Sequence, residues 1–320
     1  MWLGYPSHGE LWEDNLEPAQ AEVAALARAL AGPGGERVRL MVCGDEALSS
    51  ARARLDGARG VEFVQAQFGD IWLRDTGPIF LSGEPDCQAV AFDFNGWGGK
   101  YVLEDDDVVA EQIAAAAGAP LTRRRFVLEG GALDHDGFGA AITTRQCLLN
   151  PNRNPGWTEA TAEAALGEAL GVQRVLWLGD GLVNDHTDGH VDNLARFVAP
   201  GVIACPVAFG RADPNAEIYD ETARLLATMT GPRGAPLQVA RIASPGYITD
   251  NDGKIAPASH MNFIIANKAV IAPLYDEASG GLALDALRSL FPERAVIGLS
   301  ARAVLTGGGS FHCITQQEPA

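Results

Sequence analysis

Acidic and histidine side chains are concentrated in one stretch of the sequence, NDHTDGHVDN at residues 184–193. Histidine and aspartate at this spacing can bind a metal ion. The alternative is a strand that presents His190 and Asp192 on one face. A general base would then lie beside an anion that binds a cation or orients the imidazole. A third interpretation, a solvated turn, would need far fewer carboxylate and imidazole groups than this stretch contains. These groups belong to Asp185, His186, Asp188, His190 and Asp192.

A thiol lies close to the end of the chain, in the stretch TGGGSFHCITQQEP at residues 306–319. Cys313 follows His312 and a run of three glycines, which would let the backbone approach a ligand closely. A buried cysteine can simply fill space. A thiol combined with a histidine and carboxylates elsewhere in the chain is instead the arrangement for nucleophilic catalysis. The chain lacks the GxSxG serine motif, and GWGGKY does not have the spacing of a phosphate-binding loop.

Two further carboxylates stand in unusual contexts. Asp75 lies in GDIWLRDTGP with Trp72 and Arg74, where an aspartate could also serve as a turn former. Glu129 lies in an apolar run ending in LEGG, so it is either functional or ion-paired. Paired carboxylates hold a planar guanidinium through bidentate hydrogen bonds, and a thiolate can attack its central carbon. The chemistry therefore narrows to a cysteine hydrolase acting on a guanidine, with the candidates Cys313, His190, Asp75, Glu129 and Asp192.

Composition limits the partners and the location. The formal net charge of −17 over 320 residues argues against nucleic acid and favours a cationic ligand. No apolar run approaches the ~20 residues of a membrane-spanning helix, and the first residues lack the features of a signal peptide. The five cysteines form no CxxC pair, which predicts reduced thiols and a cytoplasmic location.

Strands and helices alternate along the whole chain. Helices are expected at 14–31, 157–171, 215–231 and 282–291, for example. Five strand–turn–strand units start near residues 63, 126, 174, 238 and 296, with helices between them. This pattern predicts an α/β radial array, with the polar residues at the strand–turn junctions converging at one end. No linker composition is present, so we expect a single domain over residues 1–320.

The motifs together resemble those of the agmatine deiminases, in the guanidine-modifying (pentein) superfamily that includes the peptidyl-arginine deiminase-like family. The resemblance covers nearly the whole chain and implies an α/β fold, a five-bladed propeller of ββαβ units. It also implies a hydrolase that acts on the C–N bonds of linear amidines, in putrescine and polyamine biosynthesis, with no metal or organic cofactor. The matching stretches are WLRDTGP, FNGWGGKY, LEGG, TTRQCLLNPNRNP, TDGHVDNLARFV and GGGSFHCITQQEP.

The resemblance implies a role for each candidate residue. Cys313 would be the nucleophile and His190 the general acid and then the base. Asp75 and Asp192 would hold the guanidinium nitrogens. The remaining residues would bind or position the substrate: Glu129 would position it or His190, Trp72 would stack on it, and Asp188 and the segment 104–107 could face a distal ammonium.

Several alternatives stay open on the sequence alone. The substrate could be arginine, free or at a peptide terminus, with Arg74 or Arg153 as the partner of its carboxylate. The cluster at 185–192 could belong to a metallohydrolase, and a non-catalytic binding propeller is a third class. The expected partner is a small cationic guanidine, with no nucleic acid and no membrane, and a homo-oligomer is left open.

Overall fold

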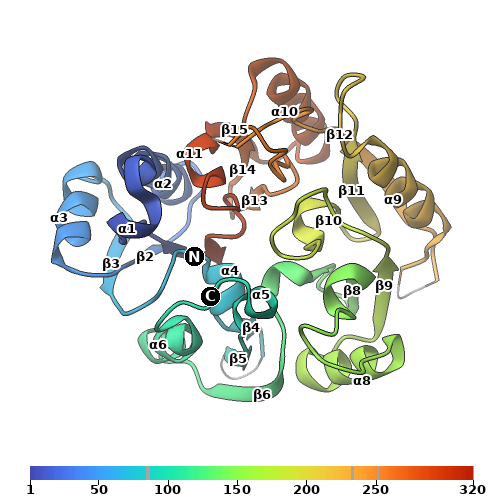
Figure 1. Cartoon of the computed structure of the whole chain (residues 1–320), viewed down its shortest axis with the longest axis horizontal. Helices are drawn as coiled ribbons and strands as arrows, with labels where there is room; N and C mark the ends of the chain where they lie inside the picture. Colours follow the sequence, from blue (N-terminus) through green and yellow to red (C-terminus); the bar gives the residue numbers. More distant parts are fainter. Residues whose placement is uncertain (84–86, 232–233, 251, 320) are drawn as a thin grey trace.

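The strands of the computed structural model form five small sheets around a common centre (Figure 1). The structure describes residues 1–83, 87–231, 234–250 and 252–319. Four of these sheets have three strands, in which an antiparallel pair is followed by a parallel pair. A helix connects the second strand to the third, as a parallel crossover requires. Each of these four sheets is therefore a ββαβ unit.

The four units follow one another along the chain. The first contains β4 (Ile79–Leu81), β5 (Gln88–Asp93), α6 (Val109–Ala117) and β6 (Leu121–Val127). The second contains β7 (Asp134–His135), β8 (Ala140–Thr144), α8 (Glu159–Leu170) and β9 (Arg174–Leu178). The third contains β10 (Arg196–Ala199), β11 (Val202–Val207), α9 (Ala216–Thr228) and β12 (Gln238–Ala243). The fourth contains β13 (Ile264–Ile265), β14 (Ala269–Leu274), α10 (Glu277–Leu290) and β15 (Ala295–Ser300).

The remaining sheet is built from both ends of the chain. Its order is β16-β1-β2-β3, and β16 (Thr315–Gln316) pairs antiparallel with β1 (Trp2–Gly4). The carboxylate of Glu318 accepts hydrogen bonds from Trp2 Nε1 at 2.8 Å and from Arg39 Nη1 at 2.6 Å. These contacts join the two ends of the ring. The other strands of this sheet are β2 (Val38–Val42) and β3 (Val61–Gln65). The helices α2 (Leu16–Ala31) and α3 (Asp45–Arg54) connect its parallel strands.

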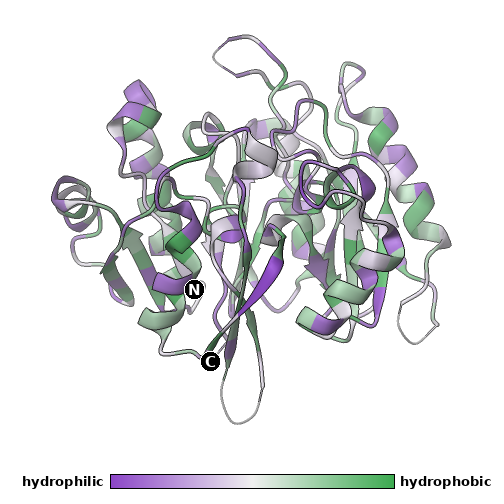
Figure 2. Cartoon of the chain, turned by 60° about the horizontal axis from the view of Figure 1, so that its bottom comes forward, coloured by the Kyte–Doolittle hydropathy of each residue, from purple (hydrophilic) through white to green (hydrophobic). Residues whose placement is uncertain are grey.

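Amphipathic patterning explains the helices and strands. Helix α2 buries Val23, Leu26 and Leu30 and ends at Gly32, as the sequence predicts. Side chains cap the helices that follow: Thr158 accepts from an N–H in the first turn of α8, and Asp276 does so for α10. Figure 2 shows hydrophobic colour on many of the strands and both colours along the helices. No helix in the described part of the chain has both the length and the apolar character needed to cross a bilayer.

The predicted boundaries of the five units are wrong. The strands near residues 63, 126, 174, 238 and 296 are β3, β6, β9, β12 and β15, and each is the last strand of its sheet. The reason is that each helical crossover returns the chain to the same sheet. The connection that follows the crossover, such as the one from β3 to β4, leads into the next sheet. The order of elements along the chain does not reveal which neighbours pair.

Short helical turns at the strand ends position the polar motifs. Turn α4 (Leu73–Thr76) contacts η3 (Gly130–Ala132) and β16, and η3 also contacts η4 (Val191–Asn193). The predicted strand through His190 and Asp192 is wrong, because these residues form the start and the interior of η4. The other short elements are α1 (Gly9–Trp12), η1 (Glu13–Asn15), α5 (Gly96–Gly99), η2 (Asp106–Val108), α7 (Arg145–Leu148) and α11 (Arg302–Leu305).

Candidate active site

Two carboxylates and an imidazole meet around the backbone of Gly131. A Cβ placed at Gly131 would lie 2.6 Å from His190 Nδ1, 2.9 Å from Asp75 Oδ1 and 3.2 Å from Asp192 Oδ2. A side chain there would displace all three groups. The second glycine of LEGG is therefore what allows residues from α4 and η4 to converge.

The thiol of Cys313 lies beside this group. Its Sγ is 3.6 Å from Asp192 Oδ2 and 3.3 Å from Asn262 Nδ2. Asn262 Oδ1 accepts from the backbone N–H groups of His312, at 2.8 Å, and Cys313, at 3.3 Å. Because one side chain fixes both the backbone and the sulfur, Asn262 sets the position of the thiol. Cys313 is only 6% exposed.

The Asp75 carboxylate is held in a fixed orientation. Gly131 N–H donates to its Oδ1 at 2.9 Å, and Trp97 Nε1–H donates to its Oδ2 at 3.0 Å. The imidazole of His190 approaches the same Oδ1, with its Nδ1 at 3.8 Å. Two neutral donors leave the negative charge of Asp75 available to a ligand cation.

Several buried polar atoms at the centre have no hydrogen-bond partner within the described residues. They are Asp192 Oδ1 and both ring nitrogens of His190. The second oxygen of Asp192, Oδ2, faces His312 Nδ1 at 2.8 Å. An unsatisfied buried polar group costs about 1–3 kcal/mol. The free oxygen of Asp192 therefore indicates that a ligand with an N–H donor belongs at this position.

Burial and charge set the protonation states. Burial, followed by the negative charges of Asp192 and Asp75, raises the pKa of the Cys313 thiol well above its ordinary value. Burial opposes charge on His190, but Asp75, Cys147 and Glu129 outweigh it and raise the pKa of the imidazole well above its usual range. Burial also raises the pKa of Asp192 to about 6. Without a ligand the site thus contains a neutral thiol beside an imidazolium and carboxylates.

Trp72 approaches Cys313 from the side of the glycine run. A Cβ at Gly309 would lie 2.5 Å from Trp72 Cζ3 and 3.2 Å from Cys313 Cβ. The indole N–H of Trp72 donates to Asp70 Oδ2 at 2.8 Å, and Trp12 donates to Asp70 Oδ1 at 2.9 Å. The two indoles are stacked at 6.3 Å. Asp70 thus fixes an aromatic wall next to the thiol.

Glu129 and Asp188 belong to a chain of ion pairs. Glu129 Oε1 accepts from Arg153 Nε at 2.6 Å, and Asp188 Oδ2 accepts from Arg153 Nη1 at 2.5 Å. Lys100 Nζ donates to Asp188 Oδ1 at 2.5 Å. Both oxygens of Asp188 thus have protein donors. These ion pairs connect the segment that contains Trp97 and Lys100 to the surroundings of His190.

The predicted cluster at 185–192 does not gather into one group. Asp185 accepts from the backbone and side chain of Thr187, and the His186 ring is stacked on Tyr101. A different set of potential metal-ligating atoms lies within 4.8 Å of one another, on Glu129, Cys147 and His190. The bound guanidinium of Arg153 already supplies the positive charge next to Glu129. Glu129 and Cys147 are therefore better suited to keep His190 protonated than to bind a metal cation together with it.

Arg74 and Arg153, which the sequence analysis considered as carboxylate partners, face other groups. Arg153 is bound to Glu129 and Asp188. Arg74 donates from Nη1 to Gln316 Oε1 at 2.8 Å and from Nε to His312 O at 3.3 Å. Both guanidinium groups are thus directed at protein atoms.

Sequence reasoning missed four residues of the site. Gly131 and Trp97 lie inside motifs that it quoted, but without an assigned role. Asn262 lies in the mostly apolar stretch HMNFII. A single polar residue in an apolar run is the same signal that drew attention to Glu129, so Asn262 could have been found in this way. Cys147 is fully buried and was not distinguished from a core cysteine.

The sequence matches a family of known enzymes. A profile of the Porphyromonas-type peptidyl-arginine deiminase family matches residues 1–319. The chain belongs to this family. The deiminases of this family act on guanidino C–N bonds, which is the chemistry that a thiol, an imidazole and two carboxylates can perform.

Characterised relatives cover nearly the full length of the chain. An agmatine deiminase from Stutzerimonas stutzeri is 38% identical over 343 residues, which span 100% of this chain and 92% of the relative. A solved agmatine deiminase from Enterococcus faecalis is 32% identical, with a TM-score of 0.91 over 99% of this chain and 92% of that chain. An amidinotransferase from Microseira wollei, 13% identical, has a TM-score of 0.50 over 85% of this chain and 83% of that chain, and shares the fold alone.

Proposed function

We propose that this protein hydrolyses agmatine to N-carbamoylputrescine and ammonia through a covalent amidino-cysteine intermediate. The observation that carries the proposal is the contact of the Cys313 thiol with the buried carboxylate of Asp192, whose Oδ1 has no hydrogen-bond partner among the described residues. The full-length similarity to agmatine deiminases supports it.

Binding would begin with the cationic guanidinium between Asp75 and Asp192. Carboxylates on either side can accept its N–H groups in the plane of the guanidinium, and Asp192 Oδ1 would gain the partner that it lacks. The stacked indole of Trp72 offers a face on which the cation or its aliphatic chain can lie. The added positive charge would favour the thiolate of Cys313, whose pKa the two carboxylates otherwise raise.

In the first half of the reaction the Cys313 sulfur attacks the guanidinium carbon. An S–C bond forms, the carbon becomes tetrahedral, and the C–N bond to a terminal nitrogen then breaks. His190 is the acid that protonates this nitrogen, which leaves as ammonia. The raised pKa of His190 suits this role, because the imidazole is protonated before the reaction.

In the second half a water molecule replaces the sulfur. His190, now neutral, removes a proton from water, and the resulting hydroxide attacks the amidino carbon. The S–C bond breaks, the thiolate is regenerated, and the carbon retains the oxygen as a ureido group. One guanidinium and one water thus yield one urea derivative and one ammonium ion. No step needs a metal or an organic cofactor.

Agmatine fits the surroundings better than arginine. A substrate carboxylate needs a cation, but Arg153 is bound to Glu129 and Asp188, and Arg74 lines a neighbouring cavity, where it donates to Gln316 and to the backbone of His312. The net charge of −17 also favours a dication over a zwitterion.

We further propose that the five sheets are the blades of a five-bladed α/β propeller and that residues 1–320 form one domain. The strand order of the sheets supports this arrangement. All five cysteines are free, which agrees with the expected cytoplasmic location.

The test is a product assay for ammonia and ureido compound with agmatine, arginine and short guanidines. We expect kcat/KM for agmatine to exceed that for arginine, measured at one pH and ionic strength. An equal or higher value for arginine would contradict the substrate assignment and leave the deiminase chemistry intact. Activity that depends on a metal and survives Cys313→Ala would instead establish the metallohydrolase alternative.

A further inference from the structure

A cavity of about 770 Å³ borders the candidate active site. Its lining includes Arg74, Gly130 and His312, whereas their immediate neighbours Asp75, Gly131 and Cys313 belong to the catalytic group. At three points the chain thus presents one residue to the cavity and the next residue to the active site. The cavity therefore adjoins the catalytic group at these three places without including its side chains.

Arg74 is a buried cation without an anionic partner at this cavity. It is 5% exposed, it forms no ion pair within the described residues, and its side chain donates only to His312 O and Gln316 Oε1. Burial and the nearby Arg196 lower the pKa of Arg74 to about 10, although Asp192 and Asp75 act in the opposite direction. A buried charge that lacks a close counter-ion is costly, so an anion in contact with Arg74 would be favoured.

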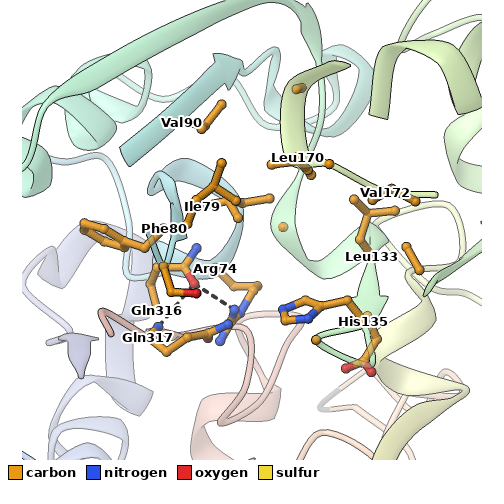
Figure 3. Close-up of a pocket in the computed structure, with 18 of the residues that line it drawn as sticks. Arg74, Ile79, Phe80, Val90, Leu133, His135, Leu170, Val172, Gln316 and Gln317 are labelled. Atoms are coloured by element: carbon orange, nitrogen blue, oxygen red, sulfur yellow. Dashed lines mark hydrogen bonds between the residues drawn. The ribbon is translucent and has the colours of Figure 1, made fainter. Parts of the chain in front are cut away.

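Gln316 adds a second donor beside Arg74. Its side chain is 1% exposed, and its Nε2 has no hydrogen-bond partner within the described residues. Its Oε1 is used by Arg74, so only the amide N–H groups remain free for a ligand. Figure 3 shows Arg74 and Gln316 side by side, with a dashed hydrogen bond between them. A charged donor and a neutral donor in contact form a recognition site for an oxyanion.

Most of the other charged side chains of the lining are paired, and the N-terminal ammonium of Met1 donates to the backbone oxygen of Arg37. Arg196 is paired with Asp134, and Arg124 is paired with Glu168. The positive charge of Arg74 is therefore not offset by a carboxylate of this lining.

One part of the cavity wall is apolar. In Figure 3, Ile79, Phe80, Val90, Leu133, Leu170 and Val172 lie across the cavity from the polar group of Arg74, Gln316 and Gln317. A volume of this size is typical of sites for small organic molecules. The site thus has one end for an oxyanion and a wall for hydrocarbon.

We propose that this cavity binds a small aliphatic carboxylate, whose carboxylate accepts hydrogen bonds from Arg74 and Gln316 and whose hydrocarbon tail lies on the apolar wall. The ligand class differs from the cationic substrate and from the amine-bearing product of the proposed reaction. The site is therefore an additional one, and its test does not depend on turnover.

The first experiment uses the unchanged chain and isothermal titration calorimetry with hexanoate, hexanamide and butyrate. Hexanoate should bind about tenfold to a hundredfold more tightly than hexanamide, because only the acid offers a charged acceptor. Each buried CH₂ adds about fourfold to the affinity, so butyrate should bind up to about fifteenfold more weakly. Equal affinity for the acid and the amide, or no detectable binding of hexanoate, would overturn the proposal.

The second experiment locates the site with two matched variants. Gln316→Glu places a carboxylate against Arg74, so it should weaken hexanoate binding about tenfold to a hundredfold and raise the melting temperature. Gln238→Glu makes the same change on an exposed side chain of β12 that does not line the cavity, and binding should stay within about fivefold of wild type. Wild-type binding in Gln316→Glu, or equal losses in both variants, would show that the carboxylate does not contact Arg74 and Gln316.

Discussion

At the scale of single residues, the site consists of charges that are costly without a substrate. Asp75 and Asp192 are buried beside a thiol whose pKa they raise, and Asp192 Oδ1 and both nitrogens of His190 have no partner within the described residues. A guanidinium would donate an N–H to Asp192 Oδ1 and offset the negative charge of the two carboxylates. In the proposed reaction the same groups would serve both binding and activation of the nucleophile.

Asp75→Asn and Asp192→Asn test the role of charge in binding. Each change preserves shape and removes an anion. Since a hydrogen bond to a charged group contributes about 1.5–3 kcal/mol, we expect agmatine binding to weaken roughly tenfold to a hundredfold. Dissociation constants measured in a Cys313→Ala background separate binding from turnover. Wild-type affinity in both variants would mean that the carboxylates have only a structural role.

The pH dependence of kcat/KM should be bell-shaped. Asp192 has a pKa of about 6, so it loses its charge as the pH falls through that value, and kcat/KM should fall with it. At high pH the activity should decline only above the ordinary range of histidine, because His190 keeps its proton there. The control is Asp192→Asn, whose residual activity should lack the acidic limb near 6. An unchanged acidic limb in this variant would assign that limb to another group.

At the scale of elements, the site depends on turns rather than on regular strands. The sequence predicted Cys313, His190, Asp75, Asp192, Glu129 and Trp72 as a group, and the structure brings them to one centre. It could not predict the neighbours that fix them. Asn262 and Gly131 act through contacts with residues 50 or more positions away, and periodicity contains no information about such pairing. The strand expected through His190 is a helical turn because tertiary contacts outweigh local alternation.

Gly131→Ala tests whether close backbone approach assembles the site. The added methyl group would lie within 3.2 Å of polar atoms of His190, Asp75 and Asp192, so these groups must move apart. A displacement of about 1 Å in a catalytic group can lower the rate a hundredfold, and we expect a loss of that order in kcat/KM. The control is Gly281→Ala in α10, where a Cβ meets nothing within 4 Å. Equal activity in the two variants would refute the role of Gly131.

At the scale of the whole molecule, the ring of sheets brings together residues from all parts of the chain. The C-terminal segment that contains Cys313 is held by β16 against β1, and Glu318 binds Trp2 and Arg39. The sequence predicted a radial array of five units but placed their boundaries one strand too early. The strand pairing that closes the ring lies between opposite ends of the chain, so no local pattern could show it.

The net charge of −17 predicts that the molecule attracts a dicationic substrate from a distance. Raising the ionic strength from about 0.01 M to about 0.15 M shortens the screening length from ~30 Å to ~8 Å. We therefore expect kcat/KM for agmatine to fall with salt, while kcat changes little. A kcat/KM that is independent of salt would show that long-range attraction does not contribute.

The central claim is that the Cys313 sulfur bonds to the guanidinium carbon during turnover. The most direct measurement is the mass of the intact protein after acid quenching of a reaction with excess agmatine. We predict a species heavier than the free protein by the mass of agmatine less ammonia, with peptide mapping locating the addition at Cys313. The same experiment on Cys313→Ser should show no such species. Turnover without any adduct on Cys313, or an adduct at another residue, would contradict the account.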